Sequence, residues 1–319
     1  MQKVFITGAS GFAGSHLVDY LISQKKYELY GTYLTERSLI NIKQNSNKIN
    51  LFQLDLQDQN KTLEIIQKIK PDSIYHLAAF ASVGQSLENP KEVIINNITA
   101  ELNLLEAIKK SDFKDIKTLI VTSADIYGKV SVKDIPIDEE TPLNPTSGYA
   151  VSKIAQDYLA LQYYTTYDIP IVRVRPFNHF GPRQSSGFVI ADFAKKIVEI
   201  ENGLIPPILN VGNLDSRRDF TDVRDMVRGY QMLLEKGLPG EAYNIGSGRS
   251  YKISEILNIL ISNAKLPISI NVDSSLFRQG EAQDRVCDST KFKRLTGWES
   301  LISLSKSLKD TLDYWRAIV

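Results

Sequence analysis

Short apolar segments alternate with amphipathic segments over the first half of the chain. Within residues 3–7, Val4, Phe5 and Ile6 form a short apolar run shortly before a glycine, which is typical of a strand buried on both faces of a parallel sheet. Apolar residues then recur at three- and four-residue spacing between Phe12 and Ile22, which gives a helix one apolar face. The pattern therefore predicts a strand, a turn and a helix.

The same alternation repeats as far as residue 175. The predicted strands are 29–33, 51–54, 73–77, 118–122 and 171–175. One predicted helix includes Ile66, and two others span 92–110 and 149–167. Residues 40–50 are expected to form a solvated loop. Strands that alternate with helices pair in parallel through right-handed crossovers. The predicted fold class is therefore α/β, with a doubly wound parallel sheet.

After Pro176 the alternation loosens. Glycines and prolines break the chain into shorter pieces, among them Gly181-Pro182, Gly187, Pro206-Pro207 and Gly212. Such pieces are too short for long sheet strands, so this part is expected to form a smaller, mixed α/β region that packs beside the sheet.

The turn between the first strand and the first helix carries three glycines. Gly8, Gly11 and Gly14 allow a tight turn and a close approach of backbone to phosphate, and the N-terminus of the helix beginning near Phe12 presents free N–H groups. A glycine triplet alone also fits an ordinary surface turn. Its position between a buried strand and an amphipathic helix favours dinucleotide binding.

Two further residues bear on the dinucleotide. The end of the second strand, residues 32–34, has no carboxylate for a ribose hydroxyl, while Arg37 follows closely and suits a 2′-phosphate. NADP is therefore favoured, with NAD as the alternative, because Arg37 also fits a solvated loop. Asp55, after the third strand, suits the adenine amino group or caps the next helix.

Tyr149 and Lys153 lie four residues apart on a predicted helix, so they project from the same face. A phenol with a pKa near 10 is protonated at neutral pH, and we expect the nearby ammonium to favour the tyrosinate. Ser123 follows a predicted strand and lies at the carboxyl edge of the sheet, where open α/β folds bind ligands. The three side chains therefore form a candidate catalytic set.

The composition excludes several classes of protein. Apolar residues make up 43% of the chain and 38 Lys and Arg balance 37 Asp and Glu, so we expect neither nucleic acid nor a membrane as a partner. A single cysteine, Cys287, cannot form an internal disulfide, and the first residues run into a strand pattern with no cleavable signal sequence. A cytoplasmic protein is expected.

No metal site is predicted either. The three histidines have no nearby carboxylate or cysteine in the sequence. His16 is expected on the outer face of the first helix, His76 is expected to be structural, and Cys287 is expected to be a packed residue rather than a nucleophile.

Four features together resemble the extended short-chain dehydrogenases/reductases that modify nucleotide sugars. They are the GxxGxxG spacing, His76-Leu77-Ala78-Ala79, the segment from Ser123 to Gly128, and the Tyr149–Lys153 pair. The segments 175–184, 187–189, 211–215 and 218–223 are similar to the GDP-mannose branch of that family. The resemblance covers nearly the whole chain. It implies a Rossmann domain at 1–176 with part of 211–247, and a nucleotide-sugar-binding domain mostly at 177–210 and 248–319.

The resemblance also implies site residues. Leu56, Ala78, Ala79 and His179 would join the glycine turn, Tyr149 and Lys153 at the cofactor. The substrate, a GDP-linked sugar, would lie along Asn178, Arg183, Val189, Val211, Asn213, Arg218 and Arg278. Arginine forks match phosphate oxygens, although Arg218 also fits an ion-pair cluster with its acidic neighbours. A homodimer or homotetramer is expected, paired through helices 92–110 and 149–167, for which Leu159, Tyr163 and Tyr164 are candidates unless they serve the core.

The set Ser123, Tyr149 and Lys153 serves a reductase, a 4,6-dehydratase or a C4-epimerase alike. A dehydratase also needs a carboxylate base. In the family this base is a glutamate, and here Asp125 occupies the position, shorter by ~1.5 Å where a misplacement of about 1 Å lowers a rate by ~100-fold. We therefore favour reduction of the C4 keto group of a GDP-4-keto-6-deoxyhexose. Dehydration with Asp125 as base, epimerisation and a non-catalytic cofactor-binding role are the alternatives.

Overall fold

The computed structural model describes residues 1–81, 83–111, 115–277 and 284–319. Its main feature is a seven-stranded sheet in the order β10-β6-β5-β4-β1-β2-β3. All neighbouring strands in this sheet are parallel. The strands are β1 (Gln2–Thr7), β2 (Tyr27–Tyr33), β3 (Asn50–Gln53), β4 (Ser73–His76), β5 (Lys117–Val121), β6 (Ile171–Pro176) and β10 (Ala242–Ile245).

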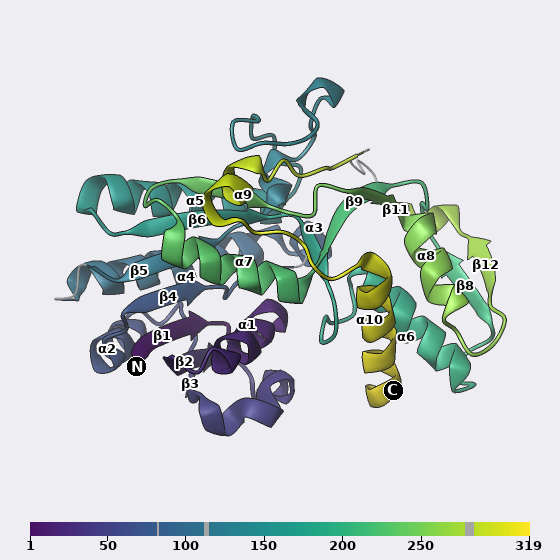
Figure 1. Cartoon of the computed structure of the whole chain (residues 1–319), viewed down its shortest axis with the longest axis horizontal. Coiled ribbons are helices and arrows are strands. Elements are labelled where there is room, and N and C mark those ends of the chain that lie inside the picture. The colour runs from purple at the N-terminus through teal and green to yellow at the C-terminus, as the bar shows by residue number, and fades with distance from the viewer. Residues whose placement is uncertain (82, 112–114, 278–283) are drawn as a thin grey trace.

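Helices cover both faces of this sheet (Figure 1). On one face, α1 (Phe12–Ser23) and α7 (Val223–Lys236) share a core with the sheet and with α9 (Thr290–Thr296). On the other face lie α2 (Gln59–Ile69), α4 (Pro90–Lys110) and α5 (Gly148–Tyr167). The strands β4 and β6 are buried along their whole length between these layers.

The smaller region lies beside the carboxyl ends of the sheet strands (Figure 1). Its strands form a three-stranded sheet in the order β11-β9-β7 and a two-stranded sheet, β12-β8. They are β7 (Asn178–Phe180), β8 (Ile208–Val211), β9 (Arg217–Asp222), β11 (Ser250–Lys252) and β12 (Ser269–Val272). The helices α6 (Val189–Glu201), α8 (Ile253–Ser262) and α10 (Leu304–Ile318) enclose a separate apolar core with β8.

Short helical segments complete the chain. They are α3 (Val83–Glu88) and the 3₁₀-helices η1 (Glu36–Lys48), η2 (Ala124–Tyr127), η3 (Val132–Asp134) and η4 (Ser274–Leu276). The solvated loop expected at 40–50 is thus largely part of η1. Ile42 in η1 is buried, because this segment packs against β2 and α1.

The predicted fold class is confirmed: the chain is α/β, with a doubly wound parallel sheet and a smaller mixed region. The chain re-enters the large sheet after the small region begins, since α7 covers one face and β10 pairs with β6 at the sheet edge. α9, from near the end of the chain, packs on α7 and β10. Tertiary contacts placed these later elements on the sheet, and their local patterns did not distinguish them.

Candidate active site

Three side chains from two elements converge at the carboxyl end of β5. Ser123 caps η2, and its Oγ accepts a hydrogen bond from the backbone N–H of Asp125 at 3.1 Å. Ser147 caps α5 through the N–H of Ala150, so that Tyr149 lies in the first turn of the helix. One turn further on, the Nζ of Lys153 donates to the carbonyl of Val121 at 3.0 Å. The predicted set is therefore brought together where α5 meets β5.

Burial dominates the electrostatics of this set. Burial raises the pKa of Tyr149, and the charge of Asp125 adds to this, while a hydrogen bond with the Ser123 side chain lowers it. The Nζ of Lys153 lies 5.9 Å from the centre of the Tyr149 ring. Burial outweighs the other influences on the phenol, and the expectation that the ammonium of Lys153 favours the tyrosinate stays a prediction. The phenol is held protonated, which suits a proton donor.

Burial also lowers the pKa of Lys153 to about 8, although the carboxyl group of Glu101 opposes this change. Both Tyr149 and Lys153 are almost fully buried. The state of this lysine is therefore sensitive to charges inside the protein rather than to solvent.

The glycine turn has the shape that a pyrophosphate requires. Gly8 has a φ of +69°, and a Cβ atom at Gly14 would lie 2.1 Å from the carbonyl oxygen of Gly8. Gly11 is the N-cap of α1, no side chain caps that end, and the first turn has no acidic residue. The N-terminal N–H groups of α1 are thus left for an anionic ligand. The residues present fit a dinucleotide.

The residues predicted near the dinucleotide surround this turn. Arg37 is exposed in η1, and η1 is held against the turn because Ser38 Oγ lies 2.6 Å from Ser10 Oγ. Ala78 follows β4, and a Cβ at Gly8 would approach its backbone within 3.0 Å. Ala79 follows it and is half-buried.

Asp55 and Leu56 lie at the end of β3. The Asp55 carboxyl accepts the backbone N–H of Gln57 at 2.9 Å, whereas the N-cap of α2 is Asp58. Asp55 is exposed and Leu56 is buried. Asp55 therefore stabilises the turn before α2, and its carboxylate is still open to a ligand.

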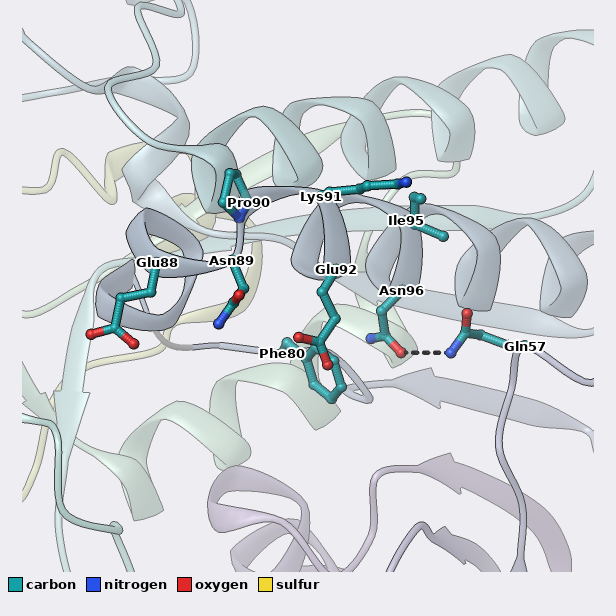
Figure 2. Close-up of a pocket in the computed structure, with 9 residues that line it drawn as sticks. All are labelled: Gln57, Phe80, Glu88, Asn89, Pro90, Lys91, Glu92, Ile95 and Asn96. Carbon is teal, nitrogen blue, oxygen red and sulfur yellow. Dashed lines mark hydrogen bonds between the residues drawn. The ribbon is translucent and has the colours of Figure 1, made fainter.

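A hollow of about 510 Å³ adjoins these residues, where the loop after β4 meets the start of α4 (Figure 2). Gln57 crosses one end of it and donates to Asn96 at 3.4 Å. Its lining consists of Gln57, Phe80, Glu88, Asn89, Pro90, Lys91, Glu92, Ile95 and Asn96. The hollow thus lies next to the predicted adenosine side of the site and apart from Tyr149.

Asp125 is bound by an arginine. Its Oδ1 accepts a short hydrogen bond from Nη1 of Arg285, whose Nη2 also donates to the carbonyl of Gly128 at 3.3 Å. The carbonyl of Arg285 accepts the N–H of Asp219 at 3.0 Å, which ties this arginine to β9. Arg285 lies 160 residues from Asp125, and the sequence analysis did not find it.

The predicted substrate residues lie along one side of the small region. Asn178 is exposed on β7 and Val189 is partly exposed at the start of α6, whereas Val211 on β8 is buried. The Asn213 side chain caps the N–H of Asp215 at 2.9 Å. Nη1 of Arg218 donates to the carbonyl of Arg217 at 2.7 Å.

Two of the predicted residues make other contacts, and one is not described. Nη2 of Arg183 donates to Asp19 of α1 at 2.6 Å. His179 stacks on Phe12, with the ring centres 5.9 Å apart, and burial lowers its pKa. Arg278 lies outside the described residues. The roles of all these residues in binding stay predictions.

Comparisons with known proteins assign the family. The model of a family described as GDP-mannose 4,6 dehydratase matches residues 5–311. The chain belongs to this family. It is 34% identical, over its full length and 98% of the relative, to a GDP-6-deoxy-D-mannose reductase of Pseudomonas aeruginosa.

Solved structures of this extended short-chain dehydrogenase/reductase type match the whole fold. RMD from Pseudomonas aeruginosa complexed with NADPH is 32% identical with a TM-score of 0.86, each chain being covered fully. UDP-glucuronic acid 4-epimerase from Bacillus cereus, in complex with UDP-glucuronic acid and NAD, is 27% identical with a TM-score of 0.88 and is also covered fully. The chain is therefore an NAD(P)-dependent enzyme of the extended family that modifies nucleotide sugars.

The structure also tests where His16, His76 and Cys287 were expected to lie. His16 is buried, and its Nε2 lies 2.8 Å from the carbonyl of Pro182, so the expectation that it faces outward is wrong. The reason is that the 181–184 loop covers this side of α1. His76 is buried on Thr7, and Cys287 is buried with a raised pKa, as expected of packed residues.

Tyr163 and Tyr164, offered for the subunit interface or the core, lie on the core side of α5. Tyr163 is buried and donates to Glu106 of α4, and the ring of Tyr164 packs against Gly240. Leu159 packs on the core beneath α4 and α5. In the described part of the chain, no helix is both long and apolar enough to cross a membrane.

Buried polar residues of α4 were missed by the sequence analysis. Asn97 accepts from the N–H of Phe80 at 2.8 Å and donates to Ser152 at 3.0 Å, which fixes the loop after β4 to α5. Glu101 is fully buried near Lys153. Both were detectable, because Glu101 lies three and four residues before the buried Leu104 and Leu105, on the apolar face of the helix.

Proposed function

We propose that this protein reduces the C4 keto group of a GDP-4-keto-6-deoxyhexose, with NADPH as the preferred cofactor. The full-length similarity to a GDP-6-deoxy-D-mannose reductase supports the substrate class. Arg37, exposed on η1 beside the glycine turn, supports the preference for a 2′-phosphate. When bound, the nicotinamide supplies the hydride.

The residues of the chain supply the proton and the orientation. Tyr149 holds its proton because burial raises its pKa, and it would release that proton to the C4 oxygen as negative charge develops there. The Ser123 hydroxyl would steady the same oxygen. We propose that the GDP-sugar is held by Asn178, Arg183, Val189, Val211, Asn213, Arg218 and Arg278. The cofactor would be held by Gly8, Gly11, Phe12, Gly14, Asp55, Leu56, Ala78, Ala79 and His179.

The observation that carries the choice of reaction is the contact between Asp125 and Arg285. A dehydratase needs a carboxylate that is free to take a proton from the sugar. Here Oδ1 of Asp125 already accepts from the guanidinium, and the backbone of Arg285 is itself anchored on β9. The carboxylate is both shorter than the glutamate expected in a dehydratase and held by a second residue. Reduction needs no such base.

Dehydration by Asp125 is the second candidate. The Asp125 carboxylate is close enough to Tyr149 to raise the pKa of the phenol, so it stands beside the reacting groups. If Arg285 moved away, the carboxylate would be released toward a bound sugar. A C4-epimerase is a weaker alternative, supported by the structural similarity to a UDP-glucuronic acid 4-epimerase.

The test gives the purified protein two substrates in parallel. GDP-mannose is supplied alone, and GDP-4-keto-6-deoxymannose is supplied with NADPH or NADH, and the products are identified by mass spectrometry. We expect the keto sugar to gain two hydrogens as NADPH is consumed, and GDP-mannose to stay unchanged. Loss of water from GDP-mannose would instead establish the dehydratase, and a C4 epimer would establish the epimerase.

The variant Asp125→Asn sharpens this test. It keeps the size of the side chain and removes the base, so a reductase should retain most of its turnover, while a dehydratase should lose about 100-fold or more. Asp138→Asn is the matched control, because Asp138 lies in the 128–147 connection and its carboxyl group caps Glu140 and Thr141.

We also propose a homodimer in which α4 and α5 pair with the same helices of a second copy. Apolar side chains on these helices are exposed, among them Ile95, Leu102, Val151 and Tyr158. Analytical ultracentrifugation should give twice the monomer mass, and Tyr158→Lys should shift the protein toward monomer. A monomeric wild type at micromolar concentration would contradict the dimer.

A further inference from the structure

An acidic side chain is buried behind the catalytic lysine. Glu101 projects from the inner face of α4 and is 0% exposed, and its Oε2 lies 4.0 Å from Nε2 of His76. Neither carboxyl oxygen makes a hydrogen bond that meets ordinary distance and angle limits among the described residues. A buried carboxyl group in this state is unfavourable unless another charge offsets it. Its neighbours therefore indicate what it does.

The hydrogen bonds of His76 exclude this histidine as the offsetting charge. Thr7 Oγ1 accepts the backbone N–H groups of Leu77 and Ala78, each at 3.2 Å, and lies 2.8 Å from Nδ1 of His76. Because a hydroxyl has one hydrogen, Thr7 donates it to Nδ1. The imidazole proton is then on Nε2, on the side of Glu101. Burial lowers the pKa of His76 to about 3, so the ring is neutral.

The charged groups of α5 complete the surroundings. Asn97, one turn before Glu101, binds Ser152 at 3.0 Å and Gln156 at 3.1 Å, so the inner face of α4 packs against the turn of α5 that carries Lys153. Lys153 and Asp157 are the charged groups of this helix that act on Glu101. Asp157 is already paired with Arg173 at a short distance and with Arg175 at 2.9 Å. Among the described residues, Lys153 is thus the cation whose charge is left for Glu101. Its Nζ donates to the carbonyl of Val121, a neutral acceptor.

We propose that the carboxylate of Glu101 is the internal counter-charge that keeps the ammonium of Lys153 protonated behind Tyr149. Glu101 acts through the lysine and is a positioning residue, since its side chain is fully buried on α4. Burial raises the pKa of Glu101 and lowers that of Lys153, and each charge opposes the shift of the other. The charge on either group therefore favours the charged form of the other.

The direct test is a titration of Lys153 by NMR. Lysines are labelled at Cε, the Lys153 signal is assigned by its loss in Lys153→Arg, and wild type is compared with Glu101→Gln, both free and loaded with NADPH. The substitution keeps shape and removes the negative charge. We expect the pKa of Lys153 to fall by about one unit or more from its wild-type value. An unchanged value would overturn the proposal.

The matched control is Glu106→Gln. Glu106 lies on the same helix and loses the same charge, but it binds Lys109, Lys110 and Tyr163 near the surface. It should leave the Lys153 signal unmoved. If Glu106→Gln shifted Lys153 as much as Glu101→Gln, the effect would be a general one of charge and the specific pairing would be refuted.

Two measurements guard against misfolding and ambiguity. In the wild type, the labelled carboxyl carbon of Glu101 should titrate at lower pH than Lys153, because the two groups are charged together only between their pKa values. A Glu101 that stays neutral up to pH 9 would contradict the pairing without any variant. Glu101→Asp should restore part of the Lys153 shift.

The effect on turnover rests on the proposed function, whereas the charge pairing does not. With ketone and NADPH, the alkaline limb of the kcat/KM profile should move to lower pH by about one unit in Glu101→Gln, since a lower lysine pKa removes the ammonium sooner. A shifted Lys153 signal in a protein that does not reduce the ketone would refute the reductase and keep the pairing. An unshifted signal in an active reductase would do the reverse.

Discussion

Charged residues are held very differently in the floor of the site and in its rim. We call Glu101, Lys153, Asp157, Arg173 and Arg175 the floor, and these side chains of α4, α5 and β6 are buried. The rim comprises Asp215, Arg217 and Lys252 around β9 and β11, where Lys252 and Asp215 pair at 3.3 Å with 43% and 88% of their side chains exposed. The Asp157 side chain is 0% exposed in its pairs.

This contrast separates two tasks. Charges in the floor interact strongly, because little solvent screens them, and their positions are fixed by helix and strand packing. Charges in the rim are screened by solvent and salt, so rearranging them costs little free energy. The floor is therefore suited to setting the protonation of Tyr149 and Lys153. The rim is suited to adapting to a nucleotide sugar.

The largest effect is expected where the floor meets the substrate. Tyr149→Phe removes the proposed proton donor, and turnover of the keto sugar should fall by about 10²–10⁴-fold while NADPH affinity stays nearly unchanged. Turnover is followed by NADPH absorbance and affinity by fluorescence titration. Tyr158→Phe, at an exposed position on the same helix, is the control and should keep full activity. Loss of activity and cofactor affinity together would mean a structural role for Tyr149.

Asp157→Asn tests the floor through stability. Removing this carboxylate leaves two buried guanidinium groups without the negative charge that offsets them, and breaking a buried pair in this way typically destabilises by about 3–5 kcal/mol. Urea denaturation at neutral pH measures the change. A loss below about 1 kcal/mol would mean that the floor charges are as weakly coupled as those of the rim.

The effect of Asp157→Asn on stability should also depend on pH. Burial alone would raise the pKa of Asp157, but the hydrogen bonds and charges of Arg175 and Arg173 outweigh it and hold the pKa below its usual value. A depressed carboxyl pKa gives stability above the unfolded-state value, near pH 4, that is lost as the pH falls through the folded-state value. The difference in unfolding free energy between wild type and Asp157→Asn should therefore shrink at pH 3. A difference that grew in acid would contradict this assignment.

The fold of the sheet region was predictable because its signal is local. The sheet strands up to β6 and the helices α1, α2, α4 and α5 have distinct apolar periods, and they appear within a few residues of their predicted positions, whereas α3 was not predicted. The placement of β10 and α7 was not predictable in the same way, since their partners are distant in sequence. His16 failed for the same reason: helix period alone does not show that the 181–184 loop covers α1.

The site divides along the same line. Gly8, Tyr149 and Lys153 were predicted as site residues from spacing, because each motif lies within one turn or one helix. Arg285 had no local signal, as it meets Asp125 only through its attachment to β9. Glu101 had a signal that was passed over, a charged residue on an apolar helix face. Spacing thus identifies residues that act within one element, and the partners that tune them come from other elements.

Arg37→Ala tests a charge that belongs to neither group and is exposed beside the glycine turn. Affinity for NADPH should fall about tenfold, roughly 1.4 kcal/mol, and affinity for NADH should not change, because only NADPH carries the 2′-phosphate. Both are measured by fluorescence titration at one salt concentration. Lys43→Ala, exposed on the same 3₁₀-helix, is the control. Equal loss for both cofactors would place Arg37 at the pyrophosphate or at the fold instead.

The smallest effect is expected in the rim. Lys252→Ala removes the partner of Asp215, and the free energy of unfolding should change by about 0.5 kcal/mol or less, since both groups return to solvent. The measurement is the same urea denaturation used for Asp157→Asn, repeated in 0.5 M salt. The effect of Lys252→Ala on the unfolding free energy should shrink further in this salt, because the screening length is about 4 Å and surface charges are screened. The effect of Asp157→Asn should persist, because salt screens buried charges much less. Similar effects for the two variants would mean that exposure does not separate floor from rim, and that the charge of Lys153 is set by the surface as much as by Glu101.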